Sequence, residues 1–139
     1  MAEQGRTSPL DTEMRAAIAA GAAQHFFIGQ GFSSPKAISL EFDISRDHPL
    51  VTMVTMVAPS PDWFAGVDGL PLFEKGAWIE ERVVTVYPWD AGTDSGRSFV
   101  SPDLETVPRQ PIARIATAPF AVGGVVAPLG TFRFTRIGS

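Results

Sequence analysis

Two aspartates four positions apart are the residues of this chain whose type and spacing could do chemistry. Asp90 and Asp94 lie between Tyr87 and Gly96, in a segment that reads YPWDAGTDSG. In an extended strand their carboxylates would be about 13 Å apart, since each residue adds roughly 3.3 Å. A hard cation needs oxygens within about 2.3–2.6 Å of its centre, so one ion could hold both only if the segment bends. Because Gly92 permits positive φ, the sequence predicts a curled acidic loop after a strand.

This acidic loop has two interpretations. Turns rich in Asp and Gly are common connectors, which cap their own backbone without binding a ligand. Calcium is the alternative, because it takes about six to eight oxygens from carboxylates and carbonyls in a flexible cage. The loop is not an EF-hand, since counting from Asp90 places Ser95 and Ser101 where that motif has Gly and Glu. A calcium site here therefore needs a further ligand from another part of the chain.

The segment from Pro59 to Leu70, which reads PSPDWFAGVDGL, could supply that ligand. Together with Trp78, the acidic loop and PIARI at residues 111–115, it resembles the spondin domain. This domain is the N-terminal module of F-spondin and mindin, and it also occurs in bacterial proteins. The match is near-continuous from about Pro59 to Thr117, and the absence of cysteine makes the chain similar to a bacterial-type member.

The resemblance implies an antiparallel β-sandwich that binds one calcium ion (Ca²⁺). The three aspartates that hold the ion in the family fall on Asp62, Asp90 and Asp94. The resemblance also implies an extracellular or cell-surface location and a protein or glycan surface ligand as partner. Residues 1–139 are expected to form a single spondin-like domain that lacks the first strands of the family.

The elements that must position these aspartates can be predicted from the pattern of the chain. Ser8 as N-cap, Pro9 at the first helical position and Gly21 as a stop predict one short helix from about Pro9 to Ala20. Alternating or continuous apolar runs separated by Gly and Pro predict about seven or eight short strands, and therefore an all-β sandwich. The expected strands are residues 25–28, 38–44, 51–57, 78–87, 112–117, 120–126 and 130–137.

Composition excludes several classes of function. The chain has 139 residues, of which 45% are hydrophobic and 19% charged, so it is long enough and apolar enough for one globular domain. A net charge of −4 argues against binding nucleic acid, whose phosphates require a basic face. No apolar run is long enough to span a membrane, and the start does not have the pattern of a signal peptide.

The leading functional hypothesis is a calcium-binding, non-enzymatic adhesion or recognition module. The alternative is a structural or assembly domain that calcium stabilises, with a homo-oligomer as its expected form. A remote alternative is an aspartic protease-like enzyme that uses Asp94-Ser95-Gly96, since retroviral-type proteases place a catalytic aspartate in an Asp-Thr/Ser-Gly loop. In those enzymes apolar residues lead into the motif, whereas Asp90 to Thr93 precede it here.

Overall fold

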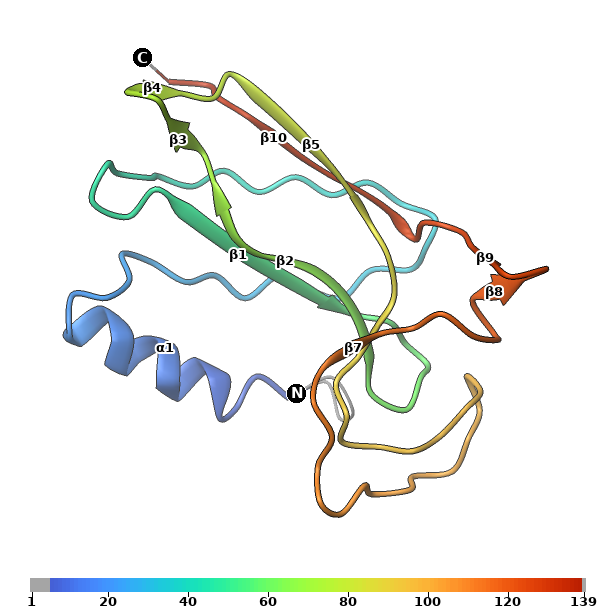
Figure 1. Ribbon diagram of the computed structural model, residues 1–139. Coiled ribbons are helices and arrows are strands. Elements are labelled where there is room, and N and C mark those ends of the chain that lie inside the picture. The colour runs from blue at the N-terminus through green and yellow to red at the C-terminus, as the bar shows by residue number, and fades with distance from the viewer. Residues whose placement is uncertain (1–5, 139) are drawn as a thin grey trace. The chain divides into compact units, whose positions relative to one another are not determined.

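The computed structural model describes residues 6–138 of the chain. The chain divides into two compact units (Figure 1). One unit comprises residues 7–49, and the other comprises the described residues from Leu50 onward together with Arg6.

The first unit contains the predicted helix, α1 (Leu10–Ala19). It ends as expected at Gly21, which has a φ of 71°. The Gly21 amide donates to the Ile18 carbonyl at 3.0 Å and the Ala22 amide donates to the Ala17 carbonyl at 2.9 Å, which together form a Schellman motif. The prediction of Ser8 as N-cap is wrong, because Pro9 occupies that position without a side-chain cap. Among the described residues no helix is long and apolar enough to cross a bilayer.

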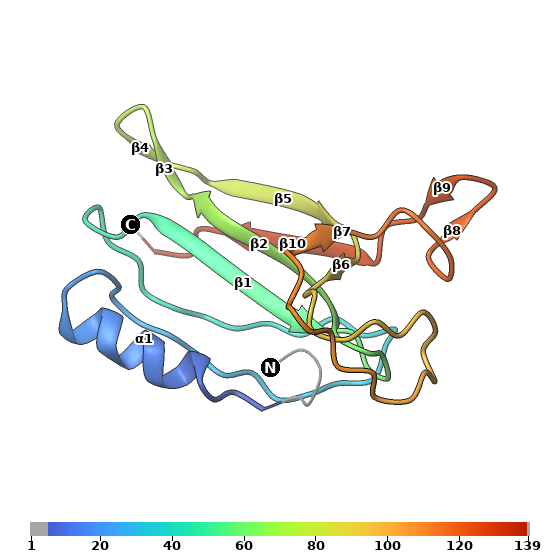
Figure 2. The same cartoon turned by 60° about the horizontal axis from the view of Figure 1, so that its bottom comes forward.

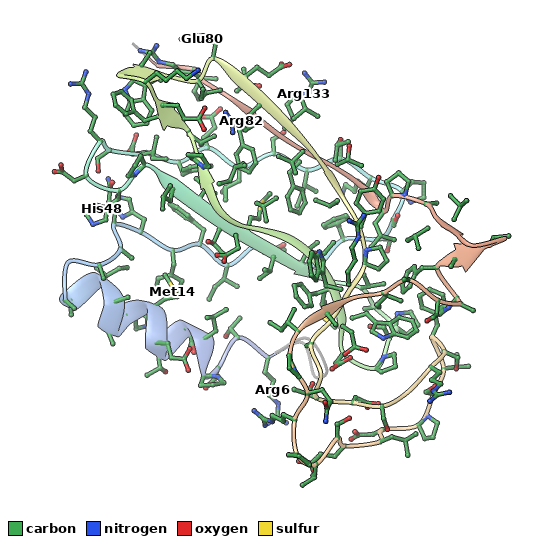
Figure 3. The ribbon with its side chains drawn as sticks, in the orientation of Figure 1. Arg6, Met14, His48, Glu80, Arg82 and Arg133 are labelled. Atoms are coloured by element: carbon green, nitrogen blue, oxygen red, sulfur yellow. The ribbon has the colours of Figure 1, made fainter. Side chains whose placement is uncertain are left out.

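Residues 22–49, all of which the structure describes, contain no strand. The strands predicted at residues 25–28 and 38–44 are therefore wrong. Alternation fixes which side chains share a face, but a strand also needs a partner for its backbone groups, and none pairs with this segment among the described residues. The unit is held by other contacts: Phe27 packs on Phe42 with ring centroids 6.2 Å apart, and Nε2 of His48 donates to the Gly21 carbonyl at 3.0 Å (Figure 3).

The second unit is built on a four-stranded antiparallel sheet in the order β1-β2-β6-β7. Its long strands are β1 and β2, which form a hairpin, and the two short strands extend the sheet beside the start of β2 (Figure 2). The bounds are β1 (Leu50–Met56), β2 (Trp63–Pro71), β6 (Trp89–Asp90) and β7 (Ala113–Arg114).

Three antiparallel pairs complete the unit, and in both views the β8–β9 hairpin projects from the rest of it (Figures 1 and 2). They are β5 (Glu81–Val86) with β10 (Gly130–Thr135), β3 (Phe73–Glu74) with β4 (Ala77–Trp78), and β8 (Ala121–Val122) with β9 (Val125–Val126). The predicted all-β antiparallel class and the one N-terminal helix are confirmed. The described residues hold ten strands rather than seven or eight. Turns split the predicted runs 78–87 and 120–126, and three strands, β2, β3 and β6, lie outside all the predicted runs.

Asp68 and Gly69, residues that are typical of turns, lie within β2. They form a bulge, in which the two of them oppose the single residue Thr52 of β1. Gly69 takes a φ of 57°, and Oγ1 of Thr52 accepts the Gly69 amide at 3.0 Å while donating to the Asp68 carboxylate at 2.8 Å. Asp68 is thus engaged along the hairpin.

Two ion pairs lie along the β5–β10 ribbon and at its end, where Figure 3 labels Glu80 and Arg133. Arg133 pairs with Glu81 at 2.5 Å, and Arg136 pairs with Glu80 at 2.8 Å. Pairs of this kind contribute little in water, on the order of 0–1 kcal/mol each. The stability of the unit therefore depends mainly on its buried apolar side chains, which are Trp63, Ala65, Leu72, Val86 and Ile115.

Candidate functional site

Asp62 lies in the turn between β1 and β2, one residue before β2 begins. The turn is closed by the Val57 amide, which donates to the Trp63 carbonyl at 2.9 Å. Inside it, Oγ of Ser60 accepts the Trp63 amide at 3.2 Å and donates to the Val57 carbonyl. This packing leaves Asp62 with 0% of its surface exposed. A carboxylate buried to this degree requires compensating partners.

The acidic loop starts where β6 ends, at Asp90, which pairs with Trp63 of β2. As the sequence predicts, the loop bends: Gly92 has a φ of 74°. Residues 92–95 and 104–110 form the two arms of the loop, which run along each other. Three backbone hydrogen bonds of 2.9 Å join the arms. These bonds run from the Ser95 amide to the Leu104 carbonyl, from Thr106 to Thr93 and from Gln110 to Gly92.

The Asp62 side chain is the centre of this loop. Its Oδ2 accepts the Thr93 amide at 2.6 Å, the Thr93 hydroxyl at 2.9 Å and the Asp94 amide at 3.1 Å. Among the described residues no donor reaches its Oδ1, which is buried. The structure thus brings Asp62 against the Asp90–Asp94 loop, although 31 positions separate Asp62 from Thr93.

Asp94 is also buried, with 4% of its surface exposed. Its Oδ1 accepts the Gly96 amide at 2.6 Å, and its Oδ2 accepts the Leu104 amide at 3.1 Å. Gly96 is closely surrounded, since a Cβ there would lie 2.7 Å from atoms of Pro61 and Ser101. Asp94 therefore organises both arms of the loop, and the loop packs on the turn that carries Asp62.

Asp90 shows the electrostatic effect of this arrangement. Partial burial raises the pKa of its carboxyl above the ordinary value of 3.8. The Gly92 amide, which donates to Oδ1 at 2.7 Å, opposes that rise. The negative charges of Asp62 and Asp94 raise the pKa further. Both neighbouring carboxylates are thus close enough to repel Asp90. A cation placed among the three would remove this repulsion.

We expect Asp90→Asn to stabilise the metal-free protein at neutral pH by less than about 1 kcal/mol, since solvent screens a partly buried group. The asparagine oxygen can still accept the Gly92 amide, while the repelled charge is gone. A raised pKa makes the wild type lose stability as pH rises through that pKa, so the gain should vanish as pH falls towards 3.8. Thermal melting with a chelator at neutral and acid pH checks this, with Asp103→Asn, an exposed position, as control.

An aromatic cluster is centred on Trp63, the residue that follows Asp62. Trp63, next to Asp62, is buried and packs edge-to-face on Phe99 at 5.3 Å and on Phe120 at 5.0 Å. These two rings also contact each other, at 5.4 Å. Trp63 is 2% exposed and is therefore part of the core beside the site. The sequence pattern did not identify Phe99 and Phe120 as its partners, because no local spacing links the three positions.

The fit of these residues to a metal can be tested on their donor atoms. Carboxylate oxygens suit calcium, and Oδ1 of Asp62 is a buried oxygen without a partner. Among residues 6–138, however, no three His, Cys, Asp or Glu side chains lie close enough together to form a metal site as they stand. Asp90 and Asp94 instead point oxygens at loop amides. Since each carboxylate oxygen has two lone pairs, such a bond does not prevent the oxygen from also binding a metal.

The fold and this site together define a class: an all-β, antiparallel domain in which a buried aspartate at a strand start organises an acidic loop. The sequence model of the spondin N-terminal domain family (Spondin_N) matches residues 1–121. The chain therefore belongs to the spondin N-terminal domain family, which confirms the resemblance found in its motifs.

Individual relatives agree with this assignment. The chain is 38% identical to Spondin-2 of Homo sapiens over 123 residues, which cover 84% of this chain and 36% of the relative. It is 45% identical to Spondin-2 of Rattus norvegicus over 80 residues, 58% of this chain and 24% of the relative. It is 43% identical to Spondin-1 of Gallus gallus over 77 residues, which cover 55% of this chain and 10% of the relative. The chain thus spans only about a third or less of these relatives.

Proposed function

We propose that this chain is a calcium-binding, non-enzymatic recognition module that acts outside the cell. Its calcium ligands are the carboxylates of Asp62, Asp90 and Asp94. The observation that carries the proposal is the Asp62 carboxylate, which is fully buried and leaves Oδ1 without a partner among the described residues. A buried oxygen of this kind is costly unless a cation or a water satisfies it.

Calcium binding at this site requires a small rearrangement. The Asp62 carboxylate already lies against the backbone of Thr93 and Asp94, while the side chains of Asp90 and Asp94 cap amides of their own loop. Rotation of these two side chains towards Oδ1 of Asp62 would close the set, and carbonyl oxygens of the loop and water would fill the remaining positions. The ion would then link the β1–β2 turn to the loop after β6.

The need for rearrangement indicates a weak site, since part of the binding free energy is spent on reorienting the Asp90 and Asp94 side chains, which are bonded to loop amides. Dissociation constants of about 10⁻⁴–10⁻³ M are typical of extracellular calcium modules. Membership in the spondin family supports the same location, as well as a protein or glycan surface ligand as partner. A glycan array with and without calcium tests that recognition: binding that calcium removal abolishes supports it, and no binding in either condition contradicts it.

Calcium should raise the melting temperature of the protein. At about 100 times its dissociation constant, the ion would add roughly 2.7 kcal/mol to the free energy of unfolding. For a chain of this size, that corresponds to a rise of about 8 °C. The measurement is thermal melting with saturating calcium and with a chelator.

Two variants make this experiment specific for the site. Asp62→Asn keeps the shape of the side chain but removes its charge, and it should lose most of the calcium-dependent rise. Asp68→Asn removes a charge from the same strand pair, at an exposed position bonded to Thr52, and should keep the full rise. An unchanged midpoint of the wild type up to about 100 mM calcium, which is about 100 times the weakest dissociation constant expected, would reject the proposal.

A structural or assembly role is the second candidate. It is favoured by β1, which among the described residues pairs only with β2 and has the exposed apolar side chains Leu50, Val54 and Met56. An unpaired strand edge is a template for pairing with another chain. Sedimentation analysis distinguishes the two roles, since a calcium-dependent oligomer without any ligand binding would favour assembly.

The enzyme alternative receives little support at Asp94. Both of its oxygens accept backbone amides, and the side chain is almost completely buried. In aspartic proteases, the catalytic aspartate shares a proton with a second carboxyl group. It must also be accessible to the substrate. We therefore assign Asp94 to the organisation of the loop and to calcium rather than to catalysis.

A further inference from the structure

The two oxygens of the Asp62 carboxylate have very different surroundings. Oδ2 accepts three hydrogen bonds, from the Thr93 amide, the Thr93 hydroxyl and the Asp94 amide. Oδ1 is buried, and no donor reaches it among the described residues. Because Oδ2 has no capacity left, an approaching cation would meet Oδ1 alone.

Thr93 supplies two of the three donors that create this difference. Its backbone is fixed independently, since its carbonyl accepts the Thr106 amide from the returning arm of the loop at 2.9 Å. Thr93 is therefore a rigid point from which both an amide and a hydroxyl hold Oδ2, at 2.6 and 2.9 Å. The carboxylate cannot turn about its last side-chain bond without breaking both contacts.

We propose that Thr93 is a positioning residue, which holds the Asp62 carboxylate so that it binds calcium through Oδ1 as a single-oxygen ligand. This inference rests on the calcium site proposed above. It adds a role for a side chain that does not itself touch the ion. Partners that orient a metal ligand in this way typically change metal affinity by about 10–100-fold when they are removed.

The test compares Thr93→Val with Thr93→Ser. Valine keeps the shape and the backbone amide but lacks the hydroxyl, whereas serine keeps the hydroxyl. We expect Thr93→Val to weaken calcium binding about 10-fold, which is at the low end of the range for such partners. Thr93→Ser should bind calcium within about 3-fold of the wild type. Isothermal titration with calcium measures both. Thr106→Val, in the opposite arm, is the matched control, because Thr106 pairs with Thr93 through its backbone amide.

A merely structural role of the hydroxyl gives a different result. In that case Thr93→Val would lower the melting temperature equally with calcium and with chelator, and its dissociation constant would match that of the wild type, which overturns the inference. If Thr93→Val does not melt cooperatively, Thr93→Ala removes the same hydroxyl without adding bulk and takes its place. A wild type that fails to bind calcium overturns the proposed function and this inference together, whereas normal wild-type binding with unchanged Thr93→Val affinity overturns this inference alone.

Discussion

Replacing Gly92 with alanine should lower the free energy of unfolding by about 3–5 kcal/mol. Gly92 has a φ of 74°, a conformation that costs an alanine roughly 1–2 kcal/mol. A Cβ at this position would also lie 2.1 Å from the carbonyl oxygen of Gln110. That oxygen belongs to the backbone, and the Gln110 amide is itself bonded to the Gly92 carbonyl, so neither arm can move away without breaking the pair.

Gly123→Ala is the matched control for this prediction. Gly123 also has a positive φ, of 58°, but a Cβ there would meet no atom within 4 Å. Its substitution should therefore cost at most the backbone strain, about 1–2 kcal/mol. Urea unfolding of the two variants measures the difference, which isolates the clash with Gln110. Equal losses in both variants would contradict the close approach of the two arms.

The second large effect is expected for Asp62→Ala in the absence of calcium. The substitution leaves the Thr93 amide, the Thr93 hydroxyl and the Asp94 amide without their acceptor. Unsatisfied buried donors cost about 1–3 kcal/mol each, and the relief of repulsion at Asp90 offsets part of that cost. We therefore expect a net loss of about 3 kcal/mol, measured by urea unfolding with a chelator present.

Asp62→Asn separates the hydrogen bonds from the charge. Its amide oxygen can take the place of Oδ2, so this variant should lose only about 1 kcal/mol without calcium. Thus the alanine variant tests Asp62 as an acceptor for the loop, and the asparagine variant tests it as a metal ligand. Wild-type stability of Asp62→Ala in chelator would show that the loop does not depend on this carboxylate.

The bend of the acidic loop was predictable from the sequence because it is a local property. A cation shared by Asp90 and Asp94 would require the bend, and Gly92, which has a φ of 74°, allows it. The partner that makes Gly92 necessary was not predictable, since Gln110 lies far along the chain. The proximity of Asp62 to the acidic loop was implied by the family resemblance, and no spacing within this chain indicated it.

Other features escaped prediction for the same physical reason. Thr93 gave no signal as a partner of Asp62, because a threonine between glycine and aspartate is unremarkable in a turn. The strand predicted at residues 38–44 has the right alternation but no pairing partner among the described residues. No strand was predicted at residues 63–71, where β2 lies, and its bulge contains Asp68 and Gly69, which are also typical of turns.

The β8–β9 hairpin has a practical consequence. Its turn, Gly123-Gly124, is surrounded by open space, and the flanking Val122 and Val125 are 80% and 71% exposed. Exposed tips of small residues are where chains best tolerate inserted sequence. A short peptide epitope or a labelling tag placed between the two glycines would leave the aspartate loop untouched, and so provides a way to immobilise the protein while its ligands are sought.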